Sequence, residues 1–250
     1  MIDQNVGYVK LSSFSQTAFQ SVQSEFQSLH DKGMELAILD LRNNGGGLLF
    51  EAVRIVNLFV PKGELVVSTR GRVERENREF KTKETPLFPD VPLVILINDK
   101  SASASEIVAG SLQDLDRAVI VGQQSFGKGL VQGTRFFEDG SSIYITAARY
   151  HLPSGRCIQK KNYNKNYNLD SPPNLSQNKT FFSLNKRPLK NAHGVSPEIK
   201  LGYKSEELKI FQVIEKTTLP FDFAIKCYKN HYNEYSNNWS DIQIKWKHYL

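Results

Sequence analysis

The sequence predicts an α/β fold in which short buried strands alternate with helices. Three apolar runs, at residues 36–41, 91–97 and 118–121, have the length and unbroken hydrophobicity of strands buried on both faces of a parallel sheet. A loop rich in glycine or small residues follows each run, and an amphipathic helix follows each of the first two loops. Because such sheets bind ligands at the carboxyl ends of their strands, these loops are the candidate site.

Alternation and turn residues predict the other strands. Residues 6–11 and 64–69 form short strands, and residues 130–137 and 142–149 form a hairpin around the turn at 138–141. Residues 71–90 are charged and contain proline, so they are interpreted as an exposed connection. Beyond Gly155 the chain is polar and Asn-rich to about residue 180, and the pattern then predicts a short strand near 196–201 and a helix at 206–216.

Helical spacing predicts four helices. In the first, apolar residues from Phe14 to Leu29 recur at intervals of three and four before Gly33. The other three are expected after the glycine loop at 45–47, at residues 106–115 and at residues 206–216. No internal repeat is present.

Composition and charge exclude several classes. With 40% hydrophobic and 23% charged residues in 250, the chain is neither disordered nor fibrous. Cys157 and Cys227 are too few for a disulfide scaffold and lack the spacing of a zinc site. The net charge of +6 is dispersed, with a basic cluster only at 159–165 and near the C-terminus, so we expect no nucleic-acid partner. No apolar run is long enough to predict a membrane span in this chain.

Three loop segments carry groups that can do chemistry. Residues 43–47, Asn-Asn-Gly-Gly-Gly, precede a helix, so their amides could hold negative charge on an oxygen. Three successive glycines suit a plain tight turn equally well. Residues 101–106, Ser-Ala-Ser-Ala-Ser-Glu, offer a nucleophilic hydroxyl or simple helix capping. Residues 122–129 nearly match a phosphate loop, but Gly129 replaces the required hydroxyl residue and a strand follows, which disfavours nucleotide binding.

A serine nucleophile needs a base. Of the five histidines, only His151 follows a predicted core strand, which makes a Ser–His pair the weaker alternative. Lys128 lies between two glycines and could fold inward against a neighbouring loop. Burial there would have to lower its pKa from about 10.4 towards about 7–8, which gives a neutral amine able to act as a base.

Three segments together resemble the carboxyl-terminal processing peptidases, also called tail-specific proteases. They are residues 39–47, 101–110 and 126–132, and the resemblance extends over about residues 5–160, more loosely through 194–198. It implies an α/β fold with a ClpP/crotonase-like β-α core in residues 1–158. Residues 159–250 are expected to form a C-terminal extension of strands and a helix, with an Asn/Lys-rich loop, packed on that core.

The resemblance also implies roles for individual residues. Ser103 corresponds to the nucleophile, Lys128 to the general base, and Gln132 to the residue that orients the lysine. The amides of Gly47 and Ala104 correspond to the oxyanion donors. Ser101 is then expected to shape the turn and Ser105 to cap the helix. Residues 128 and 132 would lie about 13 Å apart along an ideal strand, so their contact requires a local distortion.

The implied activity is hydrolysis of polypeptides near accessible C-terminal tails. No metal or organic cofactor is required, and the implied compartment lies outside the cytoplasm. Family members commonly carry a signal segment and a PDZ domain, for which the predicted core, beginning by residue 7, leaves no room.

We therefore expect a fragment of a longer protease. A truncated natural product and a PDZ-less paralogue remain alternatives, as does a catalytically weak peptide-binding scaffold. Association into identical copies stays open.

Overall fold

The protein is described by a computed structural model that covers residues 1–2, 5–160, 180–190 and 194–202, with Thr217, Asp222 and Ile225. The chain divides into two compact units, Met1–Leu201 and Gly202–Leu250. The predicted helix at 206–216, Cys227 and most of the basic cluster at 159–165 lie outside the described residues. The compact units divide at residue 201, and the division at residue 158 stays a prediction.

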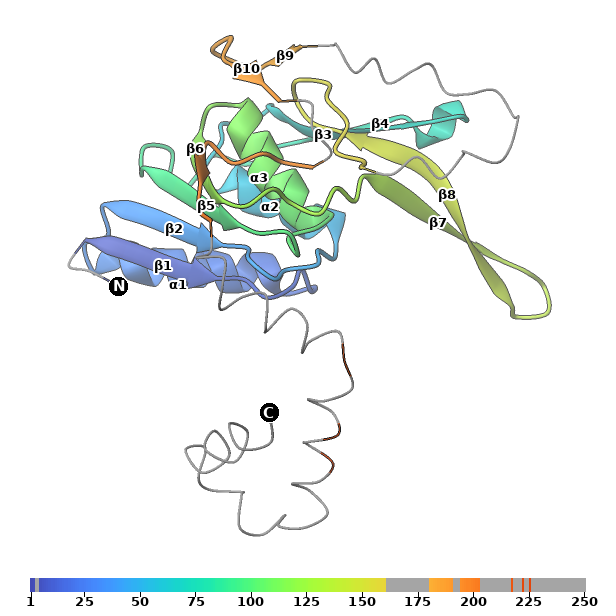
Figure 1. Cartoon of the computed structure of the whole chain (residues 1–250), viewed down its shortest axis with the longest axis horizontal. Helices are drawn as coiled ribbons and strands as arrows, with labels where there is room; N and C mark the ends of the chain where they lie inside the picture. Colours follow the sequence, from blue (N-terminus) through green and yellow to red (C-terminus); the bar gives the residue numbers. More distant parts are fainter. Residues whose placement is uncertain are drawn as a thin grey trace. The chain divides into compact units, whose positions relative to one another are not determined.

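A parallel five-stranded sheet forms the centre of the first unit (Figure 1). Its strand order is β1-β2-β5-β6-β11, and every neighbouring pair is parallel. The strands are β1 (Val6–Lys10), β2 (Leu36–Asp40), β5 (Leu93–Ile97), β6 (Ala118–Gly122) and β11 (Ile199–Lys200). This confirms the predicted α/β core.

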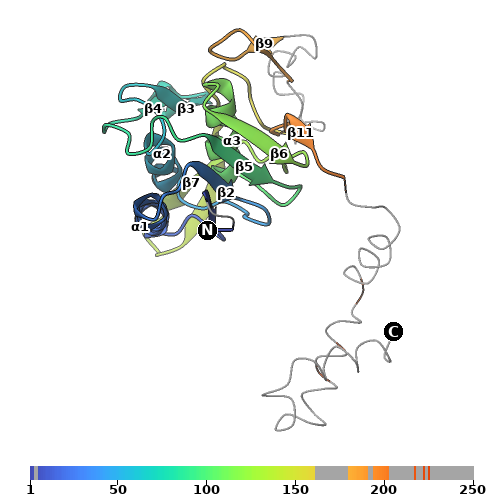
Figure 2. The ribbon, with the colours of Figure 1, turned by 90° about the vertical axis from the view of Figure 1, so that its left-hand side faces the viewer.

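Three helices pack against this sheet: α1 (Ala18–Asp31), α2 (Leu49–Asn57) and α3 (Ala104–Asp114). Figure 2 shows α1 and α2 together on one side of the strands. The buried stripe of α1 includes Val22, Phe26 and Leu29, as its spacing predicts. Phe26 meets Phe59 edge-on at 5.6 Å between ring centroids, which extends the core beyond α2.

The helix-facing side of the sheet is the fully buried one. Ala37, Leu39, Ile95 and Ile120 on that side have no exposed surface, whereas Val119 on the opposite side is 44% exposed. The prediction that these strands are buried on both faces is therefore correct for one face only. Continuous hydrophobicity in a strand does not distinguish a covered face from a half-covered one.

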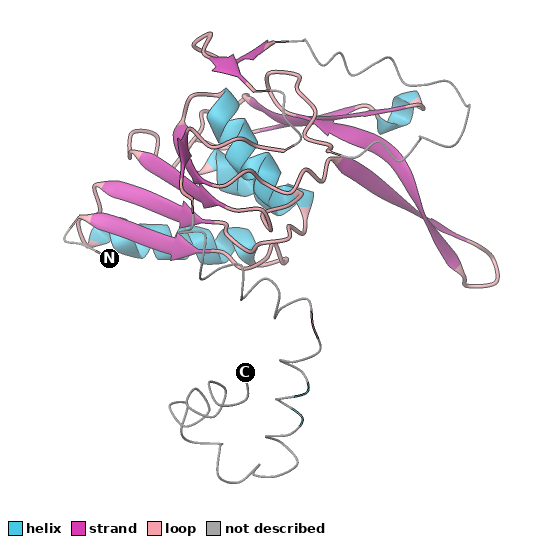
Figure 3. Ribbon diagram, viewed as in Figure 1, coloured by secondary structure: helices cyan, strands magenta, loops and turns pink. Residues whose placement is uncertain are grey.

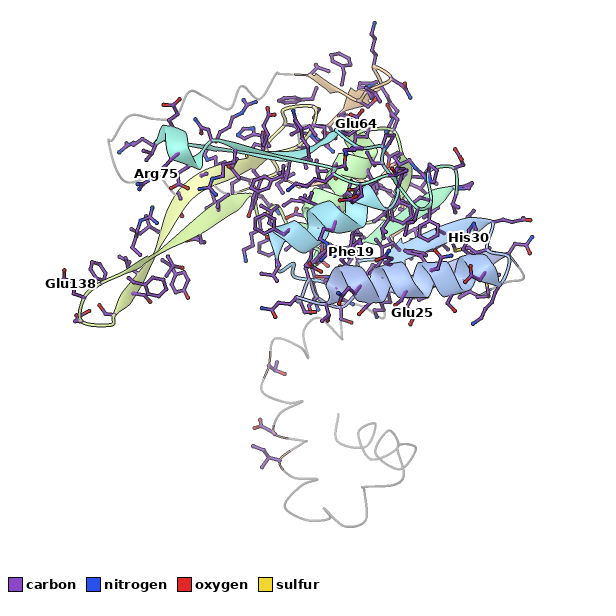
Figure 4. The ribbon with its side chains drawn as sticks, turned by 180° about the vertical axis from the view of Figure 1, so that it is seen from behind. Phe19, Glu25, His30, Glu64, Arg75 and Glu138 are labelled. Atoms are coloured by element: carbon purple, nitrogen blue, oxygen red, sulfur yellow. The ribbon has the colours of Figure 1, made fainter. Side chains whose placement is uncertain are left out.

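A second, antiparallel sheet has the order β4-β3-β8-β7. It contains β3 (Leu65–Gly71), β4 (Arg78–Lys81), β7 (Leu130–Phe136) and β8 (Ser142–His151). The hairpin of β7 and β8 confirms the predicted pair of strands and extends beyond the helices (Figure 3). Figure 4 shows Glu138 at the far end of this hairpin.

The prediction that residues 71–90 are only a connection is wrong. They contain a 3-10 turn, η1 (Glu74–Glu76), and the edge strand β4. Phe80 of β4 packs against Phe50 of α2, with ring centroids 5.8 Å apart, while the strand's charged residues face solvent. Charged residues are usual on an edge strand, so the charge that suggested a loop fits this position too.

Two further strands were not predicted. They are β9 (Phe181–Phe182) and β10 (Pro188–Leu189), an antiparallel pair. Each has two residues, which is too short for an alternating pattern. In the part of the chain that the structure describes, no helix combines the length and the hydrophobicity needed to span a bilayer.

A buried ion pair fixes the end of α3. Arg156, 2% exposed, forms an ion pair with Asp114 at 2.7 Å and donates a hydrogen bond to Gln113 at 2.6 Å. We expect Arg156→Met to lower the free energy of unfolding by about 3–5 kcal/mol, because it leaves Asp114 as an unpaired buried charge. Urea unfolding measures this, and Lys81→Met, in the exposed pair with Glu79, should cost under about 1 kcal/mol. Equal effects of the two substitutions would contradict the expectation.

Candidate active site

Ser103 occupies a strained turn immediately before α3. Its backbone angles are φ 56° and ψ −113°, a conformation that costs a non-glycine residue about 1–3 kcal/mol. The Ser103 N–H donates to Glu106 at 2.9 Å, and the Ser103 carbonyl accepts from Ile107 at 3.0 Å. Ser103 is half-buried. Ser103 is the N-cap of α3 and forms a capping box with Glu106, and a serine at this position can also act as a nucleophile.

The glycine loop lies directly against this turn. A Cβ added to Gly46, whose φ is +102°, would lie 2.7 Å from the Ala102 carbonyl oxygen and 2.8 Å from the Ser103 Cβ. Buried Asn44 fixes the loop, since its side chain donates to Leu11 at 2.8 Å and accepts from Gly46 at 2.9 Å. Glycine is needed at position 46 because only a residue without a side chain lets the two segments approach this closely.

Two serines join the glycine loop to the turn at residues 101–105. The Ser101 hydroxyl donates to the Leu41 carbonyl at 2.8 Å, and the Ser105 hydroxyl donates to the Asn44 carbonyl at 2.9 Å. Both serines have no exposed surface. The prediction that Ser105 caps the helix is wrong, because its hydroxyl holds the neighbouring loop instead.

The two predicted oxyanion donors lie on these adjacent segments. Gly47 is exposed, and Ala104 is the first residue of α3, where helix geometry leaves the N–H without an intrahelical acceptor. Among the described residues, no hydrogen bond from either amide to another part of the chain is found. An amide without a protein acceptor is what an oxyanion donor requires, so their role as oxyanion donors stays a prediction.

Glu106 connects Ser103 to the lysine loop, residues 122–129. One of its oxygens, Oε2, accepts from the backbone N–H of Ser103 at 2.9 Å and of Lys128 at 2.8 Å. The other, Oε1, accepts from Gly127 at 2.7 Å and from the Ser125 hydroxyl at 2.6 Å. Burial raises the pKa of the Glu106 carboxyl, although these four donors favour its charged form. Two residues 25 positions apart in sequence thus have backbone nitrogens on the same oxygen atom.

The sequence pattern predicts no role for Glu106 beyond capping of the helix. A glutamate three residues after a serine is a recognisable capping pattern, and it accounts for the bond to Ser103 alone. The bonds to the lysine loop depend on tertiary packing.

Lys128 is not shielded from water, although a general base at this position was expected to be buried. Its side chain is exposed, and no hydrogen bond joins it to Ser103 in the described residues. The prediction of a buried amine is wrong for this arrangement. The lysine loop holds the backbone of Lys128 in place, and the side chain extends into a cavity of about 1110 Å³ that Gln132 also lines.

Gln132 lies on β7, where the register with β8 shifts between Val131 and Gln132. This irregularity is the kind of local distortion that a contact with Lys128 requires. The Gln132 side chain donates to Thr146 at 3.2 Å across the hairpin. Both Gln132 and Lys128 line the cavity, but a direct bond between them is not among the described contacts.

A second buried carboxylate, Asp40, lies at the end of β2 and holds Arg42, which precedes the glycine loop. It accepts two hydrogen bonds from the Arg42 guanidinium, at 2.9 and 2.7 Å, and one from the Tyr8 hydroxyl at 2.6 Å. Burial opposes ionisation, but the bonds from Arg42 and Tyr8 outweigh it and hold the pKa of Asp40 below its usual range. The sequence pattern predicts no role for Asp40 or Arg42, because their partner Tyr8 lies on another strand, β1.

His151 is separated from this arrangement by its own contacts. It lies on β8, its ring Nδ1 is 3.1 Å from the Gly155 carbonyl oxygen, and burial lowers its pKa. It does not line the cavity beside Lys128. No hydrogen bond joins His151 to Ser103 or to Glu106 among the described residues, whereas the backbones of Ser103 and Lys128 both donate to Glu106.

A strained serine before a helix, a glycine loop packed on it and a lysine loop joined to it by a common carboxylate are features of a serine-type peptidase built on an α/β core. The model of peptidase family S41 matches residues 5–169 of this chain. The chain belongs to peptidase family S41.

Curated relatives carry related names. A carboxy-terminal-processing protease of Bartonella bacilliformis is 41% identical over 162 residues, covering 63% of this chain and 37% of the relative. A probable CtpA-like serine protease of Staphylococcus aureus is 32% identical over 247 residues, covering 93% and 48%. The chain therefore spans less than half the length of these relatives.

A solved structure with the same fold is a photosystem II D1 C-terminal processing protease. It superposes with a TM-score of 0.60 at 30% identity, over 78% of this chain and 42% of that one. A putative S41 protease of Bacteroides fragilis, at 17% identity and a TM-score of 0.56, supports the fold alone.

Proposed function

We propose that this chain is the catalytic core of a serine endopeptidase that cleaves polypeptides near their C-termini, with Ser103 as nucleophile and Lys128 as general base. The observation that carries the proposal is the pair of bonds from the backbones of Ser103 and Lys128 to one oxygen of Glu106, at 2.9 and 2.8 Å. Because the two backbone nitrogens share one oxygen, we infer that rotation about the lysine side chain can bring its amine to the serine. Lysine suits this because its four-carbon stem is flexible.

Substrate supplies the missing shielding. A polypeptide lying in the cavity would cover the exposed Lys128 and expel water from around it, and desolvation favours the uncharged amine. Gln132, which lines the same cavity, is proposed to orient the amine once substrate is bound.

The proposed reaction is acylation of Ser103 followed by hydrolysis of the acyl group. Neutral Lys128 takes the proton of the Ser103 hydroxyl as the serine oxygen bonds to the scissile carbonyl carbon. The amides of Gly47 and Ala104 hold the resulting oxyanion. The carbon–nitrogen bond breaks, the lysine ammonium gives its proton to the leaving amine, and water releases the acyl group by the same steps in reverse.

The surroundings of the cavity suit an extended peptide. β7 is the edge strand of its sheet, so its free backbone groups can pair with an added strand. Exposed apolar side chains continue along the hairpin, with Phe136 81% and Tyr144 72% exposed. The cavity lining includes four cationic residues and one carboxylate, Asp99, which favours a substrate with a negatively charged end such as a terminal carboxylate.

A peptide-binding scaffold is the second candidate, because Lys128 is exposed and separate from Ser103 in this arrangement. A compartment outside the cytoplasm remains part of the proposal on family resemblance alone.

The proposal is tested by incubating the protein with an unstructured peptide that has an apolar C-terminus, followed by mass spectrometry. We expect cleavage by the wild type and none by Ser103→Ala, since removal of a nucleophile eliminates covalent catalysis. Ser141→Ala, which removes an exposed hydroxyl at the hairpin turn, is the matched control and should cleave normally. Binding without cleavage by the wild type would support the scaffold instead.

A further inference from the structure

A segment distant in sequence, residues 194–201, packs against the lysine loop; we call it the closing segment. It has its own anchors on the core. Glu198 exchanges two hydrogen bonds with Ile120 of β6, both 2.9 Å long, and its carboxylate accepts from Gln113 of α3 at 2.7 Å. The Leu201 N–H donates to Gly122 at 2.9 Å, and β11 pairs with β6. The closing segment is thus fixed to β6 and α3 by bonds outside residues 125–129.

Ser125 is the point where the closing segment meets the site. The Ser125 N–H donates to the Val195 carbonyl at 3.1 Å, and the Val195 N–H donates to the Ser125 hydroxyl oxygen at 2.7 Å. The same hydroxyl donates to Glu106 at 2.6 Å. Ser125 is 3% exposed and Val195 is fully buried, so water does not substitute for either partner. One hydroxyl therefore joins the closing segment to the carboxylate that holds Ser103 and Lys128.

Gly194 shows how closely the two segments approach. Its φ is +108°, and an added Cβ would lie 2.7 Å from the Ser125 hydroxyl oxygen, 2.9 Å from the Ser125 carbonyl oxygen and 3.2 Å from Glu106 Oε1. A side chain at this position would displace the hydroxyl from Glu106. Glycine is required here for contact with the site as well as for its backbone angle.

We propose that Ser125 is a positioning residue and that the closing segment belongs to the catalytic machinery. By holding the Ser125 hydroxyl on Glu106, the closing segment sets the position of the lysine loop relative to Ser103. Catalysis then depends on residues about seventy positions beyond the lysine. The inference rests on the proposed function, since it assigns Lys128 to the reaction.

The first experiment removes and restores the hydroxyl. We expect Ser125→Ala to lower kcat by about 10- to 100-fold with KM changed less than about threefold, because a misplaced base slows chemistry without altering substrate binding. Ser125→Thr keeps the hydroxyl and should recover most of kcat. Unchanged kcat in Ser125→Ala, or failure of Ser125→Thr to exceed Ser125→Ala, would overturn the proposal.

The second experiment acts from the closing segment and compares two glycines of similar backbone angle. Gly194→Ala places a methyl group against Ser125 and Glu106, whereas Gly63→Ala, at φ +95°, meets nothing within 4 Å. Both carry the strain of an alanine at positive φ. Measured well below the unfolding temperature of each variant, Gly194→Ala should lose kcat by about tenfold or more, and Gly63→Ala should retain it. Equal activities would overturn the proposal.

Hydrogen exchange tests the positioning without any peptidase assay. The N–H groups of Gly127 and Lys128, which donate to Glu106, should exchange faster in Ser125→Ala and Gly194→Ala than in the wild type and Gly63→Ala. Unchanged exchange in both variants would overturn the positioning role. If the two variants exchange faster than the wild type but the wild type cleaves no peptide, the positioning role stands while the proposed function fails, so the two failures are distinguishable.

Discussion

Replacing Lys128 by alanine is expected to lower kcat by about 10²- to 10⁴-fold, the contribution of a positioned general base. The free energy of unfolding should change by less than about 0.5 kcal/mol, because the side chain is exposed. The backbone N–H of residue 128 still donates to Glu106 in the variant, so the site keeps its framework. Peptide cleavage rates and thermal unfolding, measured on the same preparation, check both parts.

Lys160→Ala provides the matched control for this substitution. Lys160 is also exposed and lines the same cavity, and its backbone N–H bonds to Gly127 at 3.0 Å independently of its side chain. It should cleave within about tenfold of the wild type, since loss of one exposed charge alters the field of the cavity but removes no proton acceptor. Cleavage by Lys128→Ala at the rate of Lys160→Ala would remove Lys128 from the mechanism.

Local patterns were enough to predict most of the core. The spacing of Val22, Phe26 and Leu29 predicts the buried stripe of α1, and the apolar run at 91–97 predicts β5, because neither depends on distant residues. Local patterns do not predict the edge strand β4, because it does depend on distant residues. What makes it a strand is pairing with β3, and its charged residues resemble those of a loop.

In the site, too, local motifs could be predicted from the sequence, whereas contacts between distant segments could not. Motif resemblance brought Ser103, Lys128 and the glycine loop into one hypothesis, and the structure places their backbones together. The junction at Glu106 could not be predicted, because its donors come from Ser103 on one side and residues 125–128 on the other. The exposure of Lys128 could not be predicted either, because the sequence around a lysine between two glycines does not indicate the direction of its side chain.

Gly46→Ala is expected to lower kcat by about 10²- to 10³-fold, as loss of an oxyanion donor does. Its added Cβ would lie 2.7 Å from the Ala102 carbonyl oxygen, 2.8 Å from the Ser103 Cβ and 3.0 Å from the Ala104 nitrogen. Distances below 3.0 Å between such atoms force the glycine loop and the turn at residues 101–105 apart. The separation moves the amide of Gly47 away from that of Ala104, so the two cease to converge on one oxygen. Steady-state kinetics on the folded variant measures the loss.

Gly45→Ala separates this explanation from a simple turn. An added Cβ at Gly45 meets nothing within 4 Å, although the residue belongs to the same run of three glycines. If the run serves only to turn the chain, substitutions at 45 and 46 should impair stability and leave kcat similar in both folded variants. If it holds an oxyanion beside Ser103, kcat should fall at position 46 and stay near the wild-type value at position 45. KM should change little in either variant, because the oxyanion exists only after the serine has attacked.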